Sequence, residues 1–99
     1  MPTYGETNRF KKDHAALSTE GRKRFKGAVK NFVEDLKAKR PFRKGLRVKG
    51  VQGANGIFEM TWAEDGRATF EYGDEQISGE PHIVWRRVGT HDVLGNPQC

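Results

Sequence analysis

Apolar and polar residues alternate along two neighbouring segments in the second half of the chain. Six residues carry the alternation: Phe58, Met60, Trp62, Ala68, Phe70 and Tyr72. A period of two is typical of strands with one buried face. Glu64-Asp65-Gly66 predicts a three-residue hairpin loop in which Gly66 is left-handed after a type I turn. That loop pairs Trp62 with Ala68 and places all six side chains on one face, whereas a two-residue Asp-Gly loop would mix the faces.

The other face of this hairpin is polar. It consists of Glu59, Thr61, Arg67, Thr69 and Glu71, which we call the polar face. The expected register sets Glu59 opposite Glu71, and like charges opposed on a sheet are unfavourable. A cation is therefore expected beside them, and the candidates are Arg67, Arg86, Arg87 and His91. Two interpretations remain open here: a solvated face with surface ion pairs, or an acid/base site.

Helical periodicity dominates the first half of the chain. The clearest stripe consists of Phe25, Ala28, Val29, Phe32, Val33 and Leu36, and Pro41 is expected to stop that helix. A shorter helix is expected to begin at Thr7 as its N-cap, with Phe10, His14 and Leu17 on one face. Ser18 or Thr19 is expected to cap the second helix. Residues 1–6 are expected to form an edge strand with Tyr4 packed inward.

These elements predict one α+β domain spanning residues 1–99. The expected order is an N-terminal strand, an antiparallel helix hairpin and a three-stranded antiparallel meander, with the helices packed on one face of the sheet. Ile83 to Trp85 supply the last strand. Residues 50–56 are interpreted as a glycine-punctuated loop, and residues 95–99 are expected to fray.

Composition narrows the class of partner. The chain has 99 residues, of which 34% are hydrophobic and 31% charged, which suits one modest core. A net charge of +5 indicates a polyanionic partner: nucleic acid, an anionic membrane or an acidic protein. No apolar run is long enough to span a bilayer, and no secretory signal precedes the first helix. Cys99 is the single cysteine, which fits the cytoplasm, and the three separated histidines lead us to expect neither metal nor cofactor.

The basic residues are concentrated in one stretch. Twelve lie between positions 22 and 49, against two acids: Arg22, Lys23, Arg24, Lys26, Lys30, Lys37, Lys39, Arg40, Arg43, Lys44, Arg47 and Lys49. The last six occupy the loop after the second helix and the approach to the hairpin. Such a run is often only a solvated face, but its density and its position beside the polar face also fit a footprint for phosphates. An acidic protein would suit the same patch.

The order of elements in a small basic chain resembles the RelE/ParE superfamily of bacterial toxins from type II toxin–antitoxin pairs. The likeness covers residues 3–94. It is carried by TNRFKKDHAAL, NFVEDLKAK, LRVKGVQGANGIFEM and GRATFEY, and by the exit VWRRVGTHDVL, which is similar to that of YafQ- and YoeB-like members. The resemblance implies a RelE-like fold, a cognate antitoxin as partner and a cytoplasmic location.

The ribonuclease branch of that superfamily implies an endoribonuclease (an mRNA interferase) that cuts messenger RNA on the ribosome without a metal and so inhibits translation. The ribose 2′-hydroxyl attacks the adjacent phosphate, which requires a base, a cationic clamp and an acid. By resemblance Arg67 and His91 occupy the two expected positions, with His91 as acid and Glu59, or secondly Glu71, as base. The residues expected to bind phosphate are Arg40, Arg43, Lys44, Arg47, Lys49, Arg86 and Arg87. Two alternatives remain: a non-enzymatic ParE-like inhibitor of DNA gyrase, and an inactive domain that binds RNA or antitoxin.

Overall fold

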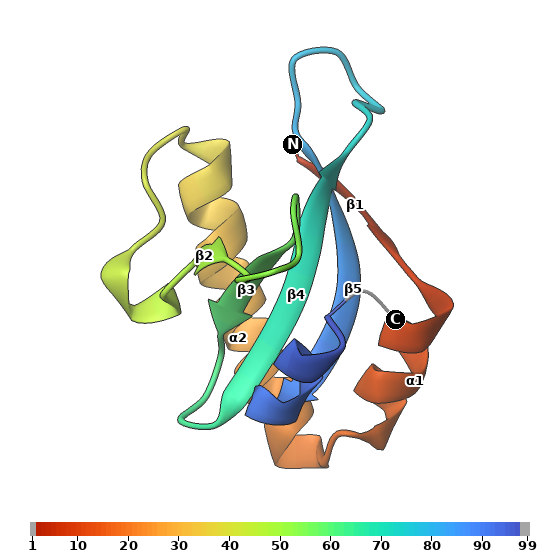
Figure 1. Ribbon diagram of the computed structural model, residues 1–99. Coiled ribbons are helices and arrows are strands. Elements are labelled where there is room, and N and C mark those ends of the chain that lie inside the picture. Colours follow the sequence, from red (N-terminus) through yellow and green to blue (C-terminus); the bar gives the residue numbers. More distant parts are fainter. Residues whose placement is uncertain (1, 98–99) are drawn as a thin grey trace.

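A computed structural model describes residues 2–97 as a five-stranded sheet with one long helix across one face and a short helix beside it (Figure 1). The strand order is β1-β5-β4-β3-β2. The strands are β1 (Thr3–Glu6), β2 (Lys49–Gly50), β3 (Phe58–Thr61), β4 (Gly66–Gly73) and β5 (His82–Thr90). The helices are α1 (Asn8–Ala16) and α2 (Thr19–Lys37), and two 3-10 helices are η1 (Lys44–Leu46) and η2 (His91–Gly95).

The predicted α+β class and order of elements are confirmed. Strands β3, β4 and β5 form the expected antiparallel meander. Two features differ from the expected arrangement. β1 pairs with β5 in parallel, Thr3 opposite His82 and Glu6 opposite Trp85. The expected loop also contributes β2, which pairs with β3 through Lys49 and Gly50. The sheet is therefore mixed and has five strands.

Local capping places both helices where the sequence predicts. The Oγ1 atom of Thr7 accepts a hydrogen bond from the amide of Phe10 at 3.1 Å, and the Oγ of Ser18 accepts one from Gly21 at 3.0 Å. Two residues connect the helices, which run in opposite directions (Figure 1). α1 lies along the edge of β5, where the amide of Thr7 donates to the carbonyl of Trp85 at 3.1 Å.

The core lies between α2 and the sheet. Phe32 is fully buried, stacks on Phe42 with ring centroids 4.6 Å apart, and meets Phe70 edge-on at 5.0 Å. Trp85 closes the cluster at 5.3 Å from Phe32. Such aromatic contacts add specific geometry to a large buried apolar area. The stripe of α2 therefore faces the sheet, as predicted.

The predicted hairpin register is wrong by two residues. Phe58 pairs with Phe70, and Met60 with Ala68. A shift of two preserves the faces, so the separation of apolar from polar side chains survives. Gly66 has no positive φ, and it is required for another reason: a Cβ there would lie 2.6 Å from the ring of Trp62. The β3–β4 turn therefore has the geometry in which the ring of Trp62 packs directly over the backbone of Gly66.

The register also removes the expected repulsion between Glu59 and Glu71. Glu59 lies opposite Thr69 in β4 and opposite Lys49 in β2. The prediction that Tyr4 packs inward is wrong as well, because its side chain is 69% exposed. Tyr4 and Leu36 line an open groove that β1, α1, α2 and β5 border.

A β-bulge changes the phase of β5. Thr69 pairs with Arg87 but Phe70 pairs with Trp85, so Arg86 is an extra residue. Because of it, Trp85 and Val88, three residues apart, both belong to the core. Arg86 and Arg87 then project consecutively on the side that α2 does not cover.

The C-terminal segment crosses part of the polar face, with η2 in front of β4 and β5 (Figure 1). The Oγ1 of Thr69 donates to the carbonyl of Pro97 at 2.8 Å, and Nη1 of Arg87 donates to that of Asn96 at 2.9 Å. The expectation that residues 95–99 fray is therefore wrong for residues 96 and 97. Cys99 lies outside the described residues.

Candidate functional site

A groove of about 440 Å³ opens on the polar face between β2 and η2, and we call it the Glu59 groove. It is lined by Lys49, Gly50, Val51, Gln52, Glu59, His91 and Leu94. Glu59 projects from β3, and His91 is the first residue of η2. The Oγ1 of Thr90 caps η2 by accepting from the amide of Asp92 at 3.4 Å. The fold thus brings together a carboxylate and an imidazole 32 residues apart in the chain.

Among the described residues, the carboxylate of Glu59 is isolated within this groove. Its residue is only 8% exposed, although one wall of its groove is open. Within residues 2–97, no side chain or amide donates a hydrogen bond to its oxygens. His91 lines the same groove and is exposed.

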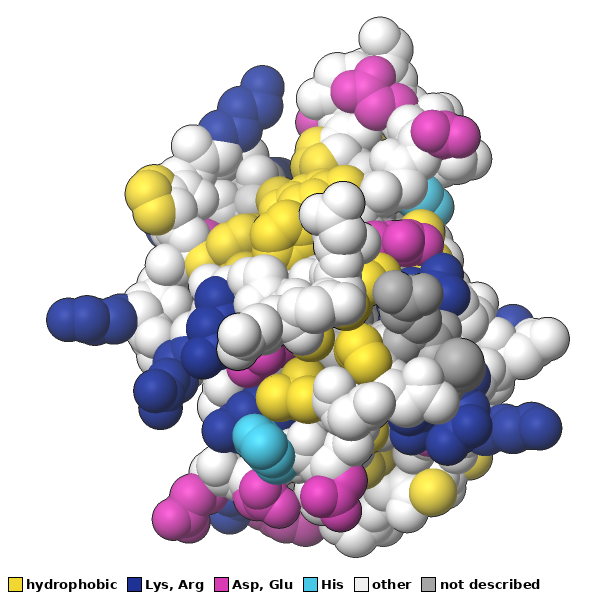
Figure 2. Space-filling model, viewed as in Figure 1, with side chains coloured by type: hydrophobic (Ala, Val, Ile, Leu, Met, Phe, Trp, Pro, Cys, Tyr) yellow, Lys and Arg dark blue, Asp and Glu magenta, His cyan; other side chains and the backbone are white. Residues whose placement is uncertain are grey.

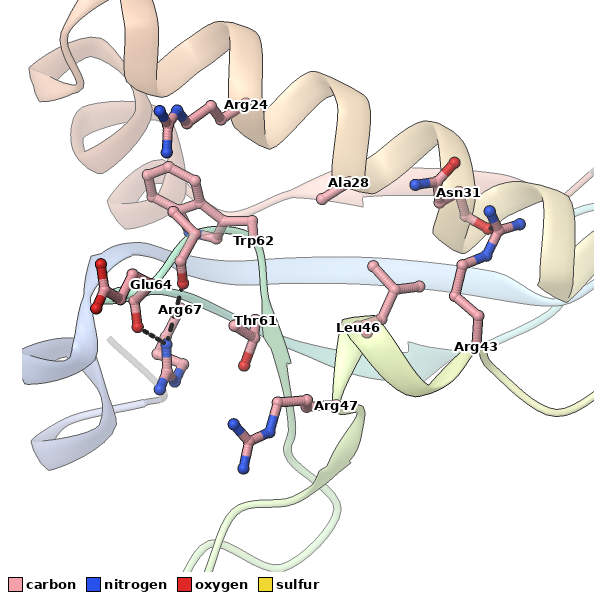
Figure 3. A pocket seen from close by; sticks show the side chains of 12 residues that line it. Arg24, Ala28, Asn31, Arg43, Leu46, Arg47, Thr61, Trp62, Glu64 and Arg67 are labelled. Carbon is pink, nitrogen blue, oxygen red and sulfur yellow. Dashed lines mark hydrogen bonds between the residues drawn. The ribbon is translucent and has the colours of Figure 1, made fainter.

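Arg67 lies on the same face but faces a second cavity of about 520 Å³, which we call the Trp62 pocket. Its Nη1 atom donates to the carbonyls of Gly66, Glu64 and Ala63 at 3.0, 3.3 and 3.4 Å. These bonds hold the guanidinium at the β3–β4 turn (Figure 3). Among the described residues, Nε and Nη2 of Arg67 have no partner. They remain able to bind an anion.

Arg47 reaches the same pocket from η1. Its φ is 48°, a left-handed backbone that side chains other than glycine rarely adopt. Figure 3 shows Arg47, Arg67 and Thr61 at one end of the Trp62 pocket. No residue of the described part of the chain pairs with the guanidinium of Arg47. A strained backbone that presents an unpaired cation is often found at a binding site.

The two cavities are neighbours along β3. Glu59 and Thr61 are two residues apart on one face of the strand, which separates them by about 7 Å. The Glu59 groove and the Trp62 pocket therefore border the same strand, although they share no lining residue. Figure 2 shows Lys and Arg side chains on both flanks of this side of the molecule, with acids gathered at the β4–β5 loop and at the β3–β4 turn. The basic flanks suit an anionic ligand, whereas the β3–β4 turn brings the acid Glu64 to one end of the Trp62 pocket.

The other predicted site residues lie elsewhere. Glu71 accepts a hydrogen bond from Nη1 of Arg86 at 2.9 Å, and neither residue lines the Glu59 groove. Arg87 is 8% exposed, and its Nε donates to the carboxylate of Asp13 at 2.6 Å. That carboxylate also accepts from the amide of Val88 at 3.3 Å, so it joins α1 to β5. Arg86 and Arg87 thus serve ion pairs within the fold.

The basic residues that follow α2 also fall into two groups, those that bind a carboxylate within the fold and those that do not. Arg40 and Arg43 bind Asp35, a residue of α2 that is 1% exposed. Nε of Arg40 donates to Oδ1 at 2.7 Å, while the amide and Nε of Arg43 donate to Oδ2 at 2.9 and 3.0 Å. The hydrogen bonds from Arg43 hold the pKa of Asp35 well below its usual range. Lys44 is exposed on η1, and Lys49 lines the Glu59 groove.

Sequence reasoning missed Asp13 and Asp35, the carboxylates that bind these arginines. Asp35 carried a signal, because it is a charge within the apolar stripe of α2 and precedes two arginines. Asp13 carried none, since its partner lies 74 residues away. The left-handed backbone of Arg47 was equally invisible in the sequence.

The described residues contain neither a cluster of metal-ligating side chains nor a membrane-spanning helix. Residues 2–97 contain no group of three or more His, Cys, Asp or Glu side chains placed to hold a metal ion. No helix in the same range is both long and apolar enough to cross a membrane.

Comparison with solved structures identifies the fold. A scan against models of known protein families found no match, and a search of curated proteins also found none. A copper-bound mutant toxin from Helicobacter pylori matches with a TM-score of 0.67 at 15% identity, over 95% of this chain and 99% of that one. YafQ in the E. coli DinJ–YafQ toxin–antitoxin complex matches with a TM-score of 0.62 at 16% identity, over 94% and 96%. A YoeB/ParE toxin from Agrobacterium tumefaciens matches with a TM-score of 0.65 at 11% identity, over 90% and 98%.

These similarities extend over nearly the whole length of both chains in each pair. The chain therefore has the fold of the RelE/ParE toxins, which confirms the predicted resemblance at the level of the fold.

Proposed function

We propose that the chain is the toxin of a toxin–antitoxin pair and that it cleaves RNA at the Glu59 groove. One observation carries this proposal: Glu59 and His91 line one groove of the polar face, with Lys49 beside them. A base, an acid and a cation are the groups that transfer of a phosphate ester to a neighbouring hydroxyl requires. The fold shared with YafQ and with a YoeB/ParE toxin supports the toxin assignment.

The reaction assigned to the groove is an internal transfer. Glu59 takes the proton from a ribose 2′-hydroxyl, whose oxygen then forms a bond to the adjacent phosphorus. The bond from phosphorus to the 5′ oxygen breaks, and His91 donates a proton to that oxygen as it leaves. Lys49 lines the same groove and stabilises the charge on the phosphorane, while Arg67, which faces the neighbouring Trp62 pocket, holds the adjacent phosphate. The products are a 2′,3′-cyclic phosphate and a free 5′-hydroxyl.

Charge and fold also support the proposed partners. The messenger RNA and the ribosome are polyanions, and the net charge of +5 favours their approach. The DinJ–YafQ structure is a complex of a toxin with its antitoxin. An antitoxin rich in acidic and apolar residues would suit the same basic surface here and would neutralise the toxin by covering it.

The direct test compares growth arrest and transcript cleavage in cells that express the wild-type chain or variants. His91→Ala and Arg67→Ala together are expected to abolish both effects, while Gln76→Ala, remote from both cavities, preserves them. Wild-type arrest and cleavage in the double variant would refute the ribonuclease assignment. DNA breaks with intact transcripts would instead select a ParE-like gyrase poison. RNA binding without any cleaved product would select an inactive binding domain.

A further inference from the structure

The Trp62 pocket has the build of a specific ligand site. Its volume is about 520 Å³, within the range of small-molecule sites. Its middle is apolar, formed by Leu46 from η1 and by Ala28 from α2, both nearly buried. The half-buried ring of Trp62 forms the adjoining wall. An apolar floor with a few convergent polar groups is typical of pockets that hold one planar ring.

The polar groups lie at opposite ends of the pocket. Figure 3 shows Arg47, Arg67 and Thr61 at the end that adjoins the polar face, together with the acid Glu64, and Asn31 at the far end on α2, so the first end carries two cations and one carboxylate. Two other arginines line the walls but are already bound: Arg24 pairs with Glu20 at 3.2 Å, and Arg43 with Asp35 at 3.0 Å. The cations left for a ligand are therefore Arg47 and Arg67, at one end only.

The carboxamide of Asn31 is available to hydrogen-bond with a ligand. Its backbone carbonyl accepts from Nη2 of Arg43 at 3.4 Å, but within residues 2–97 its side chain makes no hydrogen bond. A carboxamide presents a donor and an acceptor side by side, which is the arrangement that pairs with the edge of an adenine. The pocket thus combines a site for a phosphate, an apolar floor for a ring and a group that reads a base edge.

We propose that the Trp62 pocket binds the RNA nucleotide next to the cleaved bond, with its phosphate on Arg47 and Arg67 and its base edge on Asn31. This inference rests on the proposed function. Thr61 lies about 7 Å along β3 from Glu59, so a single strand that places one phosphate in the Glu59 groove brings its neighbour to this pocket. Single-stranded RNA can present an unstacked base to such a pocket. Asn31 is then a specificity residue and takes no part in the bond-making step.

The test uses the full chain and tetranucleotides in which every 2′-hydroxyl is methylated, so that cleavage is blocked. The chain has two tryptophans, and Trp62→Phe identifies which indole N–H signal in a ¹H–¹⁵N spectrum belongs to Trp62. Titration with the adenine tetranucleotide is expected to move the Trp62 signal and leave that of Trp85, which is 4% exposed. The adenine tetranucleotide is expected to bind at least about 5-fold more tightly than the uracil one.

Asn31→Ala is expected to remove that preference, because the carboxamide is lost while alanine suits a helix. Gln76→Ala removes a carboxamide outside the pocket and serves as the matched control. The proposal is overturned if signals near Glu59 shift while that of Trp62 does not, or if Asn31→Ala keeps the base preference. A Trp62 signal that moves with hexaglutamate but not with RNA would overturn it in favour of an acidic protein segment.

Failure of this inference can be told from failure of the proposed function. If His91→Ala abolishes cleavage in cells while Asn31→Ala leaves the base preference intact, the ribonuclease stands and the pocket assignment falls. If no signal moves with any tetranucleotide and His91→Ala cleaves like the wild type, both fall.

Discussion

The two faces of the sheet follow different physical rules. On the face that α2 covers, Phe32, Phe70 and Trp85 contact one another without a charged group among them. On the polar side of the sheet, charged residues such as Glu59 and Arg87 are nearly buried. The carboxylates on this side differ in whether an arginine binds them. Asp13, from the neighbouring helix α1, is bound by Arg87, whereas Glu59 has no partner among the described residues. The first face is built for stability, and the second contains the carboxylate to which we assign the proposed chemistry.

The same contrast divides the arginines of one loop. Arg43 binds a buried carboxylate and fixes the loop to α2. Arg47, four residues later, presents its guanidinium from a left-handed backbone without an internal partner. A dense basic run in a sequence therefore contains two kinds of cation, and only the second kind is available to a ligand. Variants on each side can test whether stability and activity really separate in this way.

The largest loss of stability is expected from Phe32→Ala. It removes a fully buried ring that contacts three other aromatic side chains, and such truncations cost about 3–5 kcal/mol. Urea unfolding followed by tryptophan fluorescence measures the change. RNA cleavage per folded molecule is expected to stay at the wild-type value. A loss below about 1 kcal/mol would show that the covered face does not dominate stability.

Glu59→Gln is expected to show the opposite pattern. The amide preserves the shape of the side chain but cannot act as a base, so cleavage should fall about 100-fold or more. The free energy of unfolding should change by less than about 1 kcal/mol, since no described residue pairs with the carboxylate. Both quantities are measured on one preparation. Glu71→Gln is the matched control, and equal activity loss in the two variants would contradict the assignment of Glu59 as base.

Arg47→Gly sharpens the contrast within the loop. Glycine tolerates the φ of 48° that costs other residues about 1–2 kcal/mol, so stability should rise or stay level despite the flexibility of glycine. Binding of the methylated tetranucleotide should weaken, and the dependence of its affinity on salt should fall by about one phosphate contact. Arg47→Lys retains the charge and should preserve the salt dependence. If Arg47→Gly were less stable than the wild type and bound the tetranucleotide equally well, Arg47 would have a structural role and no role in binding the ligand.

Asp35 should make the free energy of unfolding depend on pH in the acidic range. Its pKa is lowered on folding, so the protonated form is favoured in the unfolded chain. The contribution of its ion pairs is therefore fully present above the unfolded pKa of about 3.9, and it is lost as pH falls toward the folded pKa. The difference in thermal midpoint between wild type and Asp35→Asn, measured from pH 6 to pH 2, should be constant above about pH 5 and should shrink steadily as pH falls from about 4 to 2. A constant difference across that range would show that Asp35 is not the titrating group.

Sequence reasoning succeeded where local patterns decide the structure. Thr7 and Ser18 cap their helices, and the stripe of α2 faces the core, because these features depend on neighbours within a few residues. The faces of the hairpin were also correct, since alternation survives a shift of two. The register itself was wrong because it depends on how the ring of Trp62 covers Gly66, which no turn rule includes.

The candidate site was predictable only in part. Glu59 and His91 do line one groove, but their meeting depends on η2 crossing the polar face, which the alternation does not encode. Arg87 was expected to bind phosphate, yet the fold uses it to bind Asp13. Charge density in a sequence shows where cations are, and only the folded chain shows which of them are already occupied.

The parallel pairing of β1 with β5 has a consequence for biosynthesis. Residues 3–6 hydrogen-bond to residues 82–85, so the first strand has no partner until most of the chain has left the ribosome. Contacts between such distant segments form late and slow folding. Because η2 follows β5 in the chain, neither η2 nor the Glu59 groove can form before β5 has been synthesised. The assembled groove therefore exists only after translation of this chain has almost finished, so a partner protein of the proposed kind has that interval in which to be made.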